Sequence, residues 1–217
     1  MPNISPYTND GVISSTSGVS WNFVRQGTSG TADSSGGSGG FAVRSRKVSS
    51  GRGTQWVVSR AFFTFNTSGI AVAPASANLN IYGTHGGTAD LFVVKSTQAS
   101  TLANSDFDAI TGWDHDADNS SNVTYYSSEV TSWSTSGYNT IALNATALTD
   151  MRGLSTFNVC LIEADYDLTN TEPSTGTDVF SGVYFIEWVN SYERPYLDYT
   201  PATVAVADNA TFFGANF

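Results

Sequence analysis

The sequence predicts an all-β fold, a β-sandwich with one short helix and extended N- and C-terminal arms. Apolar and polar residues alternate in short segments that recur about every 8–15 residues, as in sandwiches and barrels. Charged residues make up only 13% of the 217 residues, and Ser, Thr, Asn and Gly take their place. Long side chains that favour helices are therefore scarce, which supports strands and turns.

Residues 57–65 form the strongest of these segments and are predicted to be a central strand. Alternation places Ala61, Phe63 and Phe65 on one face, and the two phenylalanines are large enough to anchor a core. The opposite face is only half apolar and consists of Val58, Arg60, Phe62 and Thr64. We expect that face to meet other protein rather than water, with Arg60 as a partner for carboxylates.

The chain is predicted to divide into three parts: residues 1–56, 57–200 and 201–217. The first part is a Gly- and Ser-rich basic arm, which contributes one or two strands to the sandwich. The candidate strands in the arm are residues 20–24 and 41–44, and residues 27–40 have the composition of a loop. The second part is the sandwich domain, and the third is a C-terminal tail.

Within the domain, the pattern predicts further strands at residues 77–82, 89–94, 123–126, 138–143, 157–163, 179–188 and 195–199. In the first of these, Ala77, Leu79 and Ile81 are expected to point inward. Residues 83–88 are expected to form a turn. The polar, acidic residues 96–122 are expected to form a long excursion on the surface.

A short helix is predicted at residues 145–152, with Asn144 as its cap and Gly153 at its end. Leu148 and Met151 would face inward at a spacing of three residues. The single cysteine, Cys160, lies in an apolar run and is expected to be a buried, inert thiol.

Charge is distributed unevenly along the chain. The formal net charge is −10. Residues 1–60 carry six cations and two acids, a net +4, whereas residues 61–217 carry three cations and 17 acids, a net −14. An acidic body argues against nucleic-acid binding. The basic arm is expected to complement an acidic surface, either its own or that of a neighbouring subunit.

Contacts between subunits are therefore predicted at both ends of the chain. The predicted contact residues are the cations of the arm and the phenylalanines of the tail: Arg44, Arg46, Lys47, Arg52, Phe212, Phe213 and Phe217. No secretion signal is visible in residues 1–6, and no apolar run approaches the length of a membrane span. We expect the chain to be made in a cytoplasm and to have no membrane partner.

An acidic loop is the candidate metal site. Asp114, Asp116 and Asp118 alternate at residues 114–118, and such oxygen-rich loops suit Ca²⁺. The alternative is a solvated acidic loop, because the glycine and glutamate of an EF-hand are missing. Glu163, Asp165 and Asp167 also alternate. These three are expected either to run out into solvent or to be bridged by an ion or an arginine.

Aromatic residues offer a possible surface for stacking against sugars. Trp113 and Trp133 lie in polar loop contexts and are the candidate glycan-binding residues. The alternative is that they belong to the core or to a subunit contact, as most aromatic residues of a sandwich do. No zinc, nucleotide or nucleophile motif is found in a suitable context.

The order of elements resembles the DNRLRE-type jelly-roll domains. The resemblance rests on the strand Arg60–Phe65, on Ile70, on the "A-x-L-x-[IL]-Y" strand Ala77–Tyr82, on the short helix and on the closing segment Arg194–Tyr199. It covers about residues 55–200 and implies a jelly roll. Some members of that family are carbohydrate-binding modules, and similar standalone domains look like virion proteins of tailed phages.

These observations predict a non-enzymatic virion structural protein, with capsid decoration favoured over a tail component. Its expected partners are other copies of itself and the capsid or tail subunits. The alternative is a carbohydrate-binding module or a host-glycan adhesion protein. A hydrolase is a third possibility, and it would require two convergent carboxylates across a groove.

Overall fold

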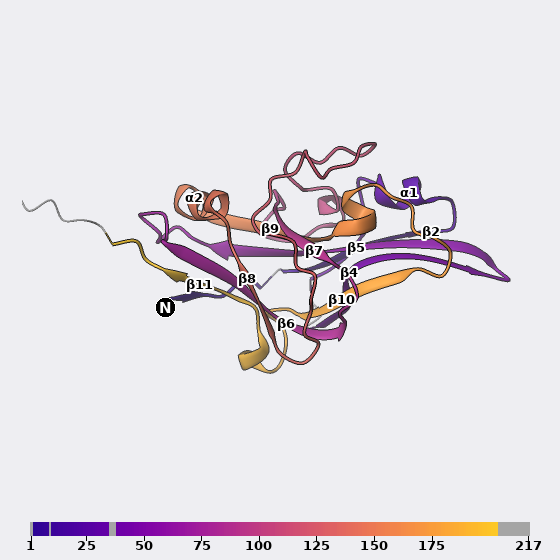
Figure 1. Ribbon diagram of the computed structural model, residues 1–217. Helices are drawn as coiled ribbons and strands as arrows, with labels where there is room; N and C mark the ends of the chain where they lie inside the picture. Colours follow the sequence, from indigo (N-terminus) through magenta and orange to yellow (C-terminus); the bar gives the residue numbers. More distant parts are fainter. Residues whose placement is uncertain (1, 9, 35–37, 204–217) are drawn as a thin grey trace, which may run out of the picture.

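The computed structural model describes residues 2–8, 10–34 and 38–203 and confirms the all-β sandwich (Figure 1). Its strands are β1 (Asn3–Ile4), β2 (Gly11–Ser17), β3 (Thr31–Asp33), β4 (Ser38–Ser50), β5 (Gly53–Asn66), β6 (Ser76–Gly86), β7 (Leu91–Lys95), β8 (Tyr138–Ala142), β9 (Thr156–Glu163), β10 (Asp178–Tyr184) and β11 (Tyr196–Thr200). Its helical segments are α1 (Trp21–Arg25), η1 (Asn104–Asp106), α2 (Ala145–Gly153), η2 (Ala164–Leu168) and η3 (Ser191–Glu193). The strand pairs of the two sheets are antiparallel.

Strand β5 is the central strand, as its sequence predicted. It pairs with β2 along one edge, and with β4 and then β9 along the other. In the last pairing, Phe63 lies opposite Val159 and Phe62 lies opposite Cys160. Strand β7 continues the sheet beyond β9.

The second sheet is built around β6. Leu79 of β6 lies opposite Leu197 of β11 and opposite Ile141 of β8. Strand β10 pairs with both β4 and β6, so it joins the two sheets at one end of the sandwich.

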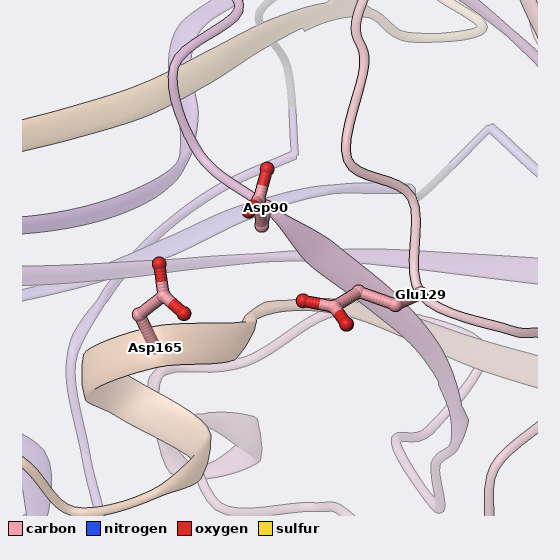
Figure 2. A group of neighbouring side chains, drawn as sticks. All are labelled: Asp90, Glu129 and Asp165. Atoms are coloured by element: carbon pink, nitrogen blue, oxygen red, sulfur yellow. The ribbon is translucent and has the colours of Figure 1, made fainter.

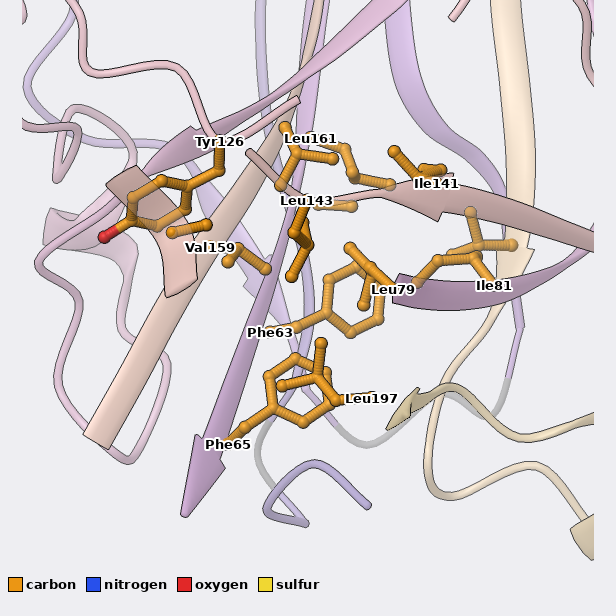
Figure 3. Packing of buried hydrophobic residues seen from close by; sticks show 14 of the residues in the cluster. Phe63, Phe65, Leu79, Ile81, Tyr126, Ile141, Leu143, Val159, Leu161 and Leu197 are labelled. Atoms are coloured by element: carbon orange, nitrogen blue, oxygen red, sulfur yellow. The ribbon is translucent and has the colours of Figure 1, made fainter. Parts of the chain in front are cut away.

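The main core lies between the sheets (Figure 3). Phe63 and Phe65 of β5 face Leu79 and Ile81 of β6, and all four side chains are fully buried. The inward alternation predicted for both strands is therefore confirmed.

A second core covers the opposite face of β5. Phe62 is packed there with Phe107 and Ile110, which belong to the long connection after β7. The surface excursion predicted at residues 96–122 is a long connection without strands and most of its residues are exposed or half-buried, but it also lies over the sheet and buries side chains against it. In Figure 1, α1 and the long loops lie on this side of the β5–β9–β7 layer, and β6 and β8 lie on the other.

The N-terminal region is more regular than its composition indicated. The sequence predicted one or two strands in residues 1–56, whereas the structure places β1, β2, β3, β4 and the start of β5 there. Residues 20–24 are not a strand: Ser20 accepts a hydrogen bond from the Phe23 amide and caps helix α1. A five-residue segment with three apolar side chains does not distinguish a strand from a helical turn, and the cap decides between them.

Other predictions are confirmed or corrected locally. The side chain of Asn144 caps α2 by accepting from the Ala147 amide at 3.0 Å, as predicted, and Met151 is fully buried. The turn predicted at 83–88 was wrong, because β6 continues to Gly86.

Cys160 is a buried free thiol, as predicted, and burial raises its pKa. None of the helices in the described ranges is long and apolar enough to cross a membrane.

Candidate functional site

The three aspartates predicted to bind calcium do not converge on one point. Asp114 accepts a hydrogen bond from the amide of Asp116 at 3.0 Å, and Asp118 accepts from the amide of Ser120 at 2.8 Å. These carboxylates therefore stabilise local turns. The loop is held from inside by Arg25, whose guanidinium donates to three of its backbone carbonyls.

A different acidic group comes together near the end of β9. Carboxylate oxygens of Asp90, Glu129 and Asp165 lie within 4.8 Å of one another (Figure 2). They come from the residue before β7, from the connection before β8 and from η2. Hard oxygen ligands of this kind suit Ca²⁺, and this is the one group of three or more potential metal ligands in the described part of the chain. Sequence reasoning missed it because its members are far apart along the chain.

The alternating acids at the end of β9 have two different structural roles. The Glu163 side chain is buried and accepts from three backbone amides of η2 and from the Ser45 hydroxyl. Burial raises the pKa of Glu163, although these donors act in the opposite direction. The Asp167 carboxylate accepts two 2.7 Å hydrogen bonds from Arg60. The prediction that Arg60 pairs with a carboxylate is confirmed.

Trp113 lies against this buried network. The guanidinium carbons of Arg25 and Arg60 lie 4.2 and 4.1 Å from the centre of its ring. The residue also lines a shallow depression, but its ring is already engaged by two cations. Its role in glycan binding remains a prediction.

Trp133 is a core residue. Its side chain is only 9% exposed, and its Nε1 donates to the carbonyl of Gly182 at 3.2 Å. The prediction of a sugar-stacking role for Trp133 was wrong, because the polar loop around it folds onto the sandwich and covers the ring.

Most of the basic residues predicted to make subunit contacts pair within the chain. Arg44 donates two hydrogen bonds to Asp178, and Arg46 lies 3.6 Å from the same carboxylate. Lys47 pairs with Glu172 at 2.7 Å. The acidic surface that these three cations complement is therefore the chain's own. Arg52, at the exposed tip of the β4–β5 hairpin, remains a candidate contact.

The phenylalanines of the tail were also predicted to make subunit contacts. Phe212, Phe213 and Phe217 lie outside the described residues.

The most extensive cluster of contacting aromatic rings in the described part of the chain was not predicted. Its rings come from β6, β8, β10, the β10–β11 connection and β11: Tyr82, Tyr138, Tyr184, Trp188 and Tyr196. The indole of Trp188 stacks on Tyr184 at 4.0 Å, and Tyr184 stacks on Tyr82 at 5.6 Å. Tyr138 then makes edge contacts with Tyr82 and Tyr196. All five residues are half-buried. We call this set the aromatic face.

Hydrogen bonds fix the polar ends of these rings. The Tyr138 hydroxyl lies 2.8 and 2.9 Å from the carbonyls of Tyr192 and Arg194, and its single hydrogen is donated to one of them or shared between both. Burial and the neighbouring Tyr196 raise the pKa of Tyr138 to about 12, so this hydroxyl stays protonated. Trp188 Nε1 donates to Glu193 at 2.6 Å. The rings of Tyr138 and Trp188 are therefore held in place before any partner arrives.

A polar ladder continues the aromatic face along the same side of the sheet. Asp198 accepts from the amide side chains of Asn78 and Asn80, and Asn80 accepts from Thr140. In β6, Asn78, Asn80 and Tyr82 alternate with the inward residues, so they lie on the outer side of the sheet, where Asn78 and Tyr82 are half-buried and Asn80 is covered.

A groove of about 460 Å³ runs along one end of the aromatic face. Its walls are Tyr138, Tyr192 and Tyr196 on the aromatic side and Asn3 and Ser5 of the N-terminal segment. Tyr192 is 71% exposed. Strand alternation places Tyr82 on the outside, but no sequence signal shows that it meets rings more than 50 residues away.

Two comparisons with known proteins found no match. No protein-family model matches the chain, and no curated protein matches it significantly. The resemblance to DNRLRE-type domains therefore remains a prediction from the residues that carry it.

Proposed function

We propose that the chain is a non-enzymatic structural protein of a tailed-phage virion, either a capsid decoration protein or another surface component. It would be held on the particle by contacts with copies of itself and with capsid or tail subunits. The aromatic face is the proposed contact surface.

The exposed aromatic face is the observation that carries this proposal. Tyr and Trp are enriched at protein interfaces, because they contribute a large contact area with little loss of side-chain freedom. Beside the face, Val189 and Tyr192 are 77% and 71% exposed, which adds accessible apolar surface. The resemblance to standalone virion domains supports the same reading.

Mass spectrometry of purified particles and co-sedimentation test the proposal. The purified chain is expected to sediment with particles assembled without it. The Tyr192→Ala variant should bind about 10-fold more weakly, as expected for a residue near an interface hot spot. Phe23→Ala is the matched control, because Phe23 is an aromatic residue on α1 that is 62% exposed. A chain that stays monomeric and never sediments with particles would contradict the proposal.

A second candidate function, host-glycan adhesion, is favoured by the polar ladder beside the rings. A sugar can stack on an aromatic ring while amide and carboxylate groups bind its hydroxyls. Asn78 and Asp198 supply such groups near Tyr196, whereas the Asn80 amide is buried and engaged by Asp198 and Thr140.

Competition separates the two functions. If the aromatic face binds glycan, a soluble polysaccharide from the host envelope should displace the chain from host cells, and Tyr196→Ala should abolish binding on a glycan array. If the face contacts virion subunits, the same polysaccharide leaves co-sedimentation with particles unchanged.

A further inference from the structure

Two interacting carboxyl groups, those of Asp10 and Glu187, lie next to Ile186, which lines the groove. Asp10 is only 1% exposed, and its carboxylate accepts the backbone amide of Ile186 at 3.2 and 3.3 Å. The neighbouring carboxyl group belongs to Glu187. Both of its oxygens are buried, and neither has a hydrogen-bond donor among the residues that the structure describes.

The charges around the pair do not neutralise it. Asp33 of β3 adds a further negative charge near Glu187. Arg194 is the nearby cation, and its charge offsets part of the repulsion between these negative charges, although its Nε donates to the carbonyl of Trp188. Two ionised carboxylates in contact would repel each other strongly in a buried site, so the pair is stable when it holds one proton between the two groups.

The pKa values of both carboxyl groups are raised as a result. Burial and the charge of Glu187 raise the pKa of Asp10 to about 9. Burial also raises the pKa of Glu187. The shared proton is therefore retained at neutral pH and lost in the alkaline range.

The two carboxyl groups lie next to the two segments that form the wall of the groove. Asp10 follows the N-terminal segment that supplies Asn3 and Ser5, and Glu187 lies in the connection that supplies Ile186 and Tyr192. A contact between Asp10 and Glu187 therefore holds one segment against the other.

We propose that Asp10 and Glu187 form a proton-dependent latch, which closes the N-terminal segment onto the β10–β11 connection and gives the groove its shape. Loss of the shared proton separates the two carboxylates and loosens both segments. The latch does not depend on what the groove binds. Only its effect on ligand or subunit binding rests on the proposed function.

Hydrogen exchange of the full chain between pH 5 and pH 10 tests the latch, with rates corrected for intrinsic exchange. Peptides that cover residues 2–8 and 185–195 should stay protected to about pH 8. Above the pKa of the pair, protection should then fall by about 10-fold per pH unit, as expected for the loss of one proton. Peptides from β5 and β9 should show no such change.

Asp10→Asn is the decisive variant. Its side-chain oxygen still accepts from the Ile186 amide, and its NH₂ group donates to Glu187 in place of the proton. Protection should therefore persist at pH 10. Glu187→Gln should give the same result with donor and acceptor exchanged, which keeps the test usable if one variant fails to fold. Asp116→Asn, on an exposed loop carboxylate, should keep the wild-type response.

Two outcomes would show that the shared proton does not hold the latch: wild-type protection that does not change with pH, or a loss of protection in both amide variants equal to that of the wild type. A third outcome, protection at pH 10 that requires Ca²⁺ and disappears on chelation, would also overturn the latch. The last outcome would show that a bound cation, rather than a proton, holds the two carboxylates together. The measurement needs no ligand, so a failure of the virion or glycan proposal leaves it unaffected.

Discussion

Arg60 shows how one residue on the central strand determines what covers the sheet. A guanidinium on a fully buried strand must be neutralised and hydrogen-bonded. Asp167 supplies two acceptors, and the carbonyl of Phe107 supplies a third at 2.6 Å. These contacts attach η2 and the long loop to the sheet.

Replacing Arg60 by Met should lower the free energy of unfolding by about 3–5 kcal/mol, because it leaves the Asp167 carboxylate buried without its main partner. Urea denaturation provides the measurement. The double variant Arg60→Met/Asp167→Leu should recover part of the loss. Arg152→Met changes an exposed cation and should cost less than about 0.5 kcal/mol. An Arg60→Met variant as stable as the wild type would mean that the network does not hold the cover in place.

Phe63 tests the main core in the same way. Its side chain is fully buried, and its ring lies 5.5 Å from that of Phe185. Phe63→Ala should cost about 3–5 kcal/mol, because it removes buried area and leaves a cavity. Thermal and urea unfolding should both report the loss, and the exposed Phe23→Ala variant should not show it.

At the scale of elements, strand alternation was the most reliable sequence signal. It placed Ala77, Leu79 and Ile81 inward, and all three are buried. It was less informative where a segment is covered on both sides. The loop residues Phe107 and Ile110 lie outside any predicted strand or helix, and local sequence does not reveal that they pack over Arg60 and Phe62.

Helix α2 offers a direct test of a sequence-derived cap. Asn144→Ala removes the acceptor for the Ala147 amide and the donor to the Tyr125 carbonyl. The expected loss is about 1–2 kcal/mol, measured by urea denaturation. Asn144→Asp keeps the cap but not the donor and should recover about half. Equal losses in both variants would show that the contact with Tyr125, rather than the cap, dominates.

At the scale of the molecule, the aromatic face shows the limit of sequence reasoning. Sequence context selected Trp113 and Trp133 because both lie in polar loops. The structure turns Trp133 into the core and collects half-buried rings from well-separated strands instead. Such a surface depends on sheet register, and register is set by the pairing of the whole sandwich.

Stability of the whole molecule should decrease as the pH rises from about 5 to 9. Asp10 and Glu163 have raised pKa values, so the folded state binds more protons than the unfolded state, in which carboxyl groups titrate near about 4. Their contribution to the free energy of unfolding is complete below the pKa of the unfolded state. It is lost as the pH rises toward the raised pKa of the folded state. Urea midpoints at pH 5, 7 and 9 measure the slope. Asp10→Asn should flatten it, and a midpoint that rises with pH would contradict this assignment.

The double pairing of β10 also has a consequence for how the chain reaches its native state. Strand β4 forms a local hairpin with β5, but its other edge is completed only by β10, with Arg44 opposite Phe180. Such distant pairing predicts slow folding, on a timescale of milliseconds to seconds. During synthesis, the edge of β4 stays open until the ribosome has released residues 178–184, and it is then available to other chains. A nascent or truncated chain that ends before β10 should therefore depend on chaperones and aggregate, although it contains most of the hydrophobic core.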